Sequence, residues 1–143
     1  MKKLQIKFYL IFIVIAIALN IIIEASVIKL GFVYYNADPK LFGISWFTFL
    51  LYFPWIIVTY ELGNKLGKKL KISRFIFYFL IGAIFAFTID QYATTVGLYG
   101  YNFNTIFSIS KVPIEDFFAV GFMITLSVSI SSYLAKRFSI SFK

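Results

Sequence analysis

The sequence has no cysteine and no histidine among its 143 residues, and only six acidic residues. Disulfides, thiolate chemistry, imidazole or thiol metal sites and histidine-based catalytic triads are therefore excluded. Charged residues make up 14% of the chain, whereas about a quarter is usual in a soluble domain. Hydrophobic residues make up 61% and aromatic residues 22%. This composition predicts a membrane protein in which any proton chemistry comes from carboxyl groups, tyrosine or lysine.

Four stretches are long and apolar enough to cross a bilayer as helices, which takes roughly 20 residues each. They lie at about residues 8–28, 44–62, 75–95 and 114–135. The predicted fold is therefore all-α: a polytopic bundle of about four transmembrane helices in a cell membrane. The first apolar run continues past Ala16-Ile17-Ala18, so we interpret it as a retained helix rather than a cleaved signal peptide.

The basic residues indicate an orientation for this bundle. Eleven of the 14 lysines and arginines precede the first stretch, separate the second from the third, or follow the fourth. The other three, on the opposite side, are Lys29, Lys40 and Lys111. This asymmetry predicts that both termini are cytoplasmic. We therefore interpret the net charge of +8 as a topology signal, with the lipid bilayer rather than nucleic acid as the partner.

The acidic residues are the main candidates for chemistry in so apolar a chain. Four of the six fall toward the outer end of the predicted bundle: Glu24, Asp90, Glu115 and Asp116. Carboxylates are costly in hydrocarbon, so we expect them to face the interior and to pair or take up a proton. Asn20 shares a helix face with Glu24. Simpler roles stay open, because Glu24 can pair with Lys29 and the acids after Pro113 can complement a helix dipole.

An ordered series of motifs joins the third stretch to the fourth. It consists of Asp90, Gly97, the aromatic turn Tyr99-Gly100-Tyr101-Asn102-Phe103-Asn104, and Pro113-Ile114-Glu115-Asp116-Phe117-Phe118. This series resembles the lycopene cyclase domain of the integral-membrane, non-flavin carotenoid cyclases. That family has an Asp, then a Gly with a Trp-x-Phe-Asn-like turn, then Pro-x-Glu-Glu or Pro-x-Glu-Asp followed by Phe-Phe. The resemblance covers about residues 47–137, and a tyrosine replaces the family's tryptophan.

The resemblance implies an organisation, a substrate and a reaction. Residues 44–143 would form a three-helix cyclase-like unit, to which residues 1–43 add an N-terminal transmembrane helix and an outer loop. The family normally combines two such units, which implies a homodimer or a heterodimer. The substrate would be a linear carotenoid or another isoprenoid. Ring closure by protonation and loss of a proton is redox-neutral and needs no metal and no cofactor.

The resemblance also implies roles for particular residues. Glu115 is the expected proton donor, Asp116 its partner and Asp90 the matching upstream acid. Successive helical residues diverge by about 100°, so Glu115 and Asp116 cannot both face one substrate atom. Aromatic ring faces can stabilise a developing carbocation. The expected substrate-binding residues are Tyr99, Tyr101, Phe117, Phe118, Glu24 and Asn20.

Two other classes of function stay open. In the first, the chain binds a carotenoid or polyprenyl lipid, or acts as a scaffold subunit, without chemistry. In the second, Glu24, Asp90 and Glu115 form a proton relay through the bundle.

Overall fold

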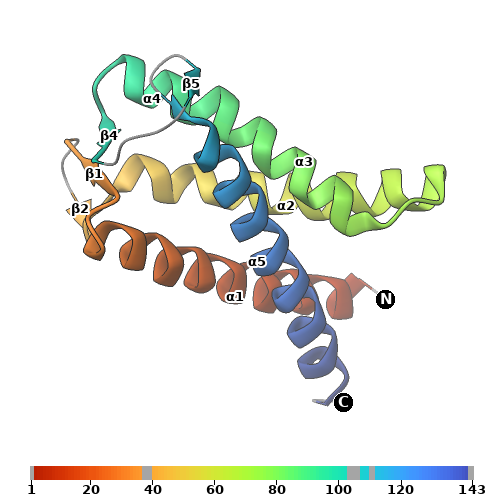
Figure 1. Ribbon diagram of the computed structural model, residues 1–143. Coiled ribbons are helices and arrows are strands. Elements are labelled where there is room, and N and C mark those ends of the chain that lie inside the picture. The colour runs from red at the N-terminus through yellow and green to blue at the C-terminus, as the bar shows by residue number, and fades with distance from the viewer. Residues whose placement is uncertain (1, 37–39, 103–106, 110–111, 142–143) are drawn as a thin grey trace.

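The computed structural model describes residues 2–36, 40–102, 107–109 and 112–141. Long helical segments dominate it, as predicted from the sequence (Figure 1). They are α1 (Lys2–Lys29), α2 (Trp46–Leu70), the run from α3 (Arg74–Phe85) to α4 (Gln91–Thr95), and α5 (Ile114–Ser141). A π-helical turn, η1 (Ala86–Asp90), joins α3 to α4. The expectation of a predominantly helical bundle is confirmed.

Within the described residues, three helical segments are long and apolar enough to cross a membrane: Gln5–Lys29, Arg74–Thr95 and Ile114–Phe138. Their length and composition support a membrane protein with transmembrane helices. The fourth predicted span, in α2, is not among them.

Helix α5 runs obliquely across α1 and packs against both α1 and α3 (Figure 1). It packs closely against α3 at two glycines, where a Cβ on Gly82 would lie 3.0 Å from the Cα of Gly121. Small residues let membrane helices pack this closely. A buried apolar cluster joins α1, α2, α3 and α5, and its members include Phe12, Ala16, Tyr52, Ile56, Tyr78, Ile124 and Val128. Helix α1 is therefore part of the same bundle as α2 to α5.

Short antiparallel strands lie at one end of the bundle, which we call the strand end. Strand β1 (Val33–Tyr35) pairs with β4 (Tyr99–Tyr101), β2 (Lys40–Leu41) with β3 (Ile44–Ser45), and β5 (Ser108–Ile109) with β6 (Val112–Pro113). The all-α prediction omitted these strands, because two or three residues are too few to show a period in the sequence. In the β1–β4 pair the Tyr34 side chain packs over Gly100, where a Cβ would lie 2.5 Å from the Tyr34 hydroxyl oxygen.

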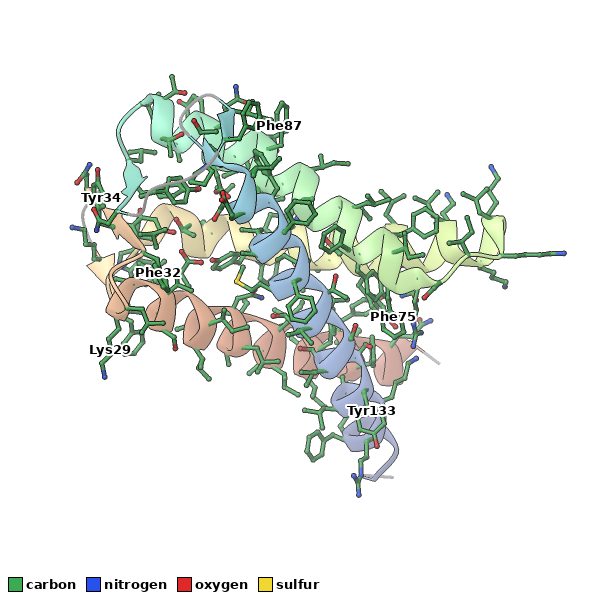
Figure 2. The ribbon with its side chains drawn as sticks, in the orientation of Figure 1. Lys29, Phe32, Tyr34, Phe75, Phe87 and Tyr133 are labelled. Carbon is green, nitrogen blue, oxygen red and sulfur yellow. The ribbon has the colours of Figure 1, made fainter. Side chains whose placement is uncertain are left out.

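The two ends of the bundle differ in charge and in chain connections. Both termini and the α2–α3 turn lie away from the strands (Figure 1). Lys65, Lys68 and Lys69 are exposed near that turn. Lys29, Phe32 and Tyr34 lie at the strand end (Figure 2).

Candidate functional site

A cavity of about 110 Å³ lies at the strand end, between α1, α2, η1, α5 and the paired strands β1 and β4. Its walls are mainly apolar and include Ile23, Val27, Leu51, Phe85, Ile89, Val120 and Met123. Three carboxylates also line it: Glu24 from α1, Asp90 from η1 and Asp116 from α5. The structure therefore brings together three of the four acids that the sequence placed at one end of the bundle.

Glu24 is held by two tyrosines from other elements. The Tyr35 hydroxyl of β1 donates to Oε1 at 2.7 Å, and the Tyr52 hydroxyl of α2 donates to Oε2 at 2.5 Å. Both tyrosine side chains are buried, whereas Lys29 is exposed at the end of α1. The carboxylate thus connects α1 to β1 and α2. These contacts take the place of the ion pair with Lys29 that the sequence left open.

Asp90 and Asp116 form the centre of the cavity. Asp90 is the last residue of η1, and a π-helical turn carries an extra residue that changes which face the following side chains present. Asp90 is in hydrogen-bonding contact with Asp116 and with Tyr99. Asp116, in the first turn of α5, is in hydrogen-bonding contact with Asp90 and Tyr101. Its Oδ2 is buried and has no hydrogen-bond partner among the described residues.

A group of tyrosines on the two paired strands surrounds these acids. The rings of Tyr35 and Tyr99 stack with centroids 5.2 Å apart, and the hydroxyls of Tyr99 and Tyr101 lie 2.9 Å apart. Burial, reinforced by the neighbouring carboxylates, raises the pKa of Tyr35, the pKa of Tyr99 and the pKa of Tyr101. These phenols keep their protons at neutral pH and can donate to the acids.

The other predicted site residues lie outside the cavity lining. Glu115 is exposed, so the cavity-facing position in the first turn of α5 belongs to Asp116. Phe118 is 60% exposed, and Phe117 packs against Phe87 with ring centroids 5.9 Å apart. Asn20 is buried one turn from Glu24, and its amide donates to the Ala16 carbonyl at 2.8 Å.

The aromatic turn is described as far as Asn102. Phe103 and Asn104 of the aromatic turn lie outside the described residues. Tyr99 lines the cavity, and Tyr101 contacts it through Tyr99 and Asp116.

Sequence reasoning missed Tyr35 and Tyr52, the two partners of Glu24. A signal was available for Tyr52, because a hydroxyl in the middle of an apolar helix needs a hydrogen-bond partner. Tyr35 gives no comparable signal, because its contact with Glu24 depends on the pairing of β1 with β4. Thr48, which also lines the cavity, was missed as well.

The arrangement suits proton transfer in an apolar enclosure. Within the described residues, no group of three or more potential ligands is placed to hold a metal ion. Two carboxyl groups in contact can share a proton, and apolar walls strengthen electrostatic interactions inside the cavity. No family model, curated protein or solved structure matches this chain.

Proposed function

We propose that this chain is a membrane isoprenoid cyclase, or a subunit of one, that closes a ring at the end of a linear carotenoid such as lycopene. One observation carries this proposal: Asp90 and Asp116, the acids in the motifs that resemble the lycopene cyclase domain, line one cavity and contact each other. Residues so far apart in the chain meet only in the folded protein, and they supply an acid and a base.

The proposed reaction needs one proton donor and one proton acceptor. The donor adds its proton to C2 of the terminal double bond, which leaves a cation at C1. The C5=C6 double bond attacks C1, so that the C1–C6 bond forms and the cation moves to C5. Loss of the proton from C6 restores the C5=C6 double bond and gives a β-ring. The proton gained and the proton lost balance, so no oxidant or reductant is involved.

In the proposed reaction Asp116 is the proton donor and Asp90 is the base. Asp116 faces the cavity and has an oxygen with no partner among the described residues. Asp90 can accept the proton from C6, and its contact with Asp116 returns the proton to the donor. Tyr35 and Tyr99 both line the cavity, and aromatic rings stabilise a nearby cation.

The size of the cavity fits an end group better than a whole substrate. Its volume of about 110 Å³ is below the roughly 300–1,000 Å³ of pockets that enclose a complete small ligand. In the proposed arrangement only the reacting end of the chain enters. The proposal includes four spans with both termini in the cytoplasm, and a second cyclase-like unit in a dimer.

Expression in a lycopene-accumulating bacterium, followed by chromatography of the extracted pigments, tests the function. The chain is expressed alone and as a fused tandem copy, and its abundance in the membrane is measured. We expect a monocyclic or bicyclic carotene, and we expect Asp116→Asn to lower its yield at least about 100-fold, the lower range for general acid catalysis. The matched control is Glu61→Gln, which alters an exposed carboxylate in α2.

Glu115→Gln separates the two candidate donors. Because Glu115 is exposed, we expect a smaller loss than for Asp116→Asn. A larger loss would return the donor role to Glu115. Unchanged lycopene despite abundant protein, alone and in tandem, would favour binding of a carotenoid or polyprenyl lipid without chemistry. Of the three acids in the relay hypothesis, Glu24 and Asp90 line the cavity, and Glu115 is exposed.

A further inference from the structure

Helix α5 contributes four of the residues that line the cavity. Asp116, Ala119, Val120 and Met123 line the cavity from a single face of this helix. Of the residues that line it, Ala119 is the one whose side chain is classed as exposed. The exposed part of the lining is therefore the small side chain of an alanine.

The surface around Ala119 is apolar and lies near the start of a helical segment long enough to span a membrane. Its neighbours on α5, Phe118 and Phe122, are each 60% exposed. Ala119 lies within two turns of the start of the span Ile114–Phe138, so it is about 8 Å from that end at 1.5 Å per residue. In the proposed four-span arrangement, a side chain at this depth faces lipid.

The helices on either side diverge at this level. Helix α5 crosses α1 near the middle of the bundle, and its N-terminal turns lie away from α1 (Figure 1). Ile23 and Val27 line the cavity from α1. Apolar residues of α1 and α5 therefore line the cavity together with the carboxylates.

We propose that Ala119 marks a lateral portal through which one linear apolar chain enters the cavity end-first from the bilayer. The occupant follows from the chemistry of the opening, because an apolar rim at lipid depth admits a hydrocarbon end and excludes ions. The inference rests on the proposed function for the identity of that hydrocarbon. The small side chain at position 119 sets the width of the portal.

The absence of cysteine from the chain allows a direct test by thiol labelling. Ala119→Cys and Phe122→Cys are each placed in lipid nanodiscs and reacted with a membrane-soluble maleimide, with and without lycopene in the bilayer. Both positions are exposed on α5, but Phe122 does not line the cavity. With lycopene at about ten times its half-saturating level, we expect labelling at position 119 to slow roughly tenfold, because only the unoccupied fraction reacts. Labelling at position 122 should not change.

Equal protection at both positions, or none at position 119, would overturn the portal. The labelling experiment is repeated in an Asp116→Asn background, which separates the portal from catalysis. Protection without a cyclic product in the parent chain contradicts the proposed function and leaves the portal in place. A cyclic product without protection contradicts the portal alone.

A series of larger side chains at position 119 gives a second test of the portal. We expect Ala119→Leu and then Ala119→Trp to lower cyclic product progressively at equal protein abundance, whereas Phe122→Trp should not. Equal yields from Ala119→Trp and Phe122→Trp would contradict control of entry at position 119.

Discussion

Two carboxylates at opposite ends of the bundle bind tyrosines in different surroundings. Glu24, at the strand end, accepts hydrogen bonds from the buried hydroxyls of Tyr35 and Tyr52. Glu61, toward the α2–α3 turn, accepts one from Tyr9 and is exposed. The same chemical pair thus occurs once in a cavity and once on the surface. The comparison shows that enclosure, rather than the type of partner, distinguishes the candidate site.

Enclosure changes the energetics of these contacts. A surface hydrogen bond exchanges with water and contributes little, whereas a buried donor that loses its partner carries the full cost of desolvation. At the strand end, three elements depend on one carboxylate. The acid cavity should therefore be both the most cooperative and the most fragile part of the fold.

The largest effect is expected from removing the carboxylate at the strand end. Glu24→Leu leaves two buried phenol hydroxyls without their acceptor, and we expect a loss of about 3 kcal/mol in the free energy of unfolding. Glu61→Leu is the matched control, with an expected loss below about 1 kcal/mol because its contact is exposed. Unfolding of both variants in mixed detergent micelles measures the difference. Equal losses would show that burial does not govern the contrast.

The next effect is expected at alkaline pH, where the free energy of unfolding should fall. Burial raises the pKa of Tyr35, Tyr99 and Tyr101 in the folded chain, while the unfolded chain ionises its tyrosines near pH 10. The folded state then binds more protons, so stability is complete below pH 10 and falls above it. Each group contributes a slope of about 1.4 kcal/mol per pH unit.

Substitution of phenylalanine tests the source of this slope. In Tyr99→Phe/Tyr101→Phe, the decline in unfolding free energy between pH 10 and 11 should be shallower than in the parent chain. The comparison is made with Tyr133→Phe, which alters an exposed tyrosine on α5. A slope that changes equally in both variants would contradict the role assigned to the strand-end tyrosines.

A smaller loss is expected from single phenol deletions beside Glu24. Tyr52→Phe removes one donor but leaves the carboxylate its bond from Tyr35, so we expect a loss of about 1 to 2 kcal/mol. Because both tyrosines bind one group, the double variant should depart from additivity. A double-mutant cycle with Tyr35→Phe measures that coupling, and strict additivity would show that the two bonds act independently.

The sequence predicts the helices and the set of acids better than it predicts their contacts. Long apolar runs predict helices α1 and α5, so the positions of these two helices follow from composition alone. The sequence does not predict which side of α5 faces inward, because Glu115 and Asp116 are adjacent. Only packing against η1 selects between them. The contacts of Tyr35 and Tyr52 with Glu24 join positions 11 and 28 residues apart, beyond the reach of any local pattern.

The smallest effect is expected in the middle of the bundle, where polar atoms are buried without partners. The Ser127 hydroxyl is fully buried and has no hydrogen-bond partner among the described residues. We interpret it as a small residue that permits close packing between membrane helices. Ser127→Ala keeps the side chain small and removes an unpaired polar atom, so the free energy of unfolding should change by no more than about 0.5 kcal/mol. A loss above about 1 kcal/mol in the same micelle assay would show that the hydroxyl is paired in the bilayer, and the contrast between the middle of the bundle and the tyrosine-bound acids of the strand end would then disappear.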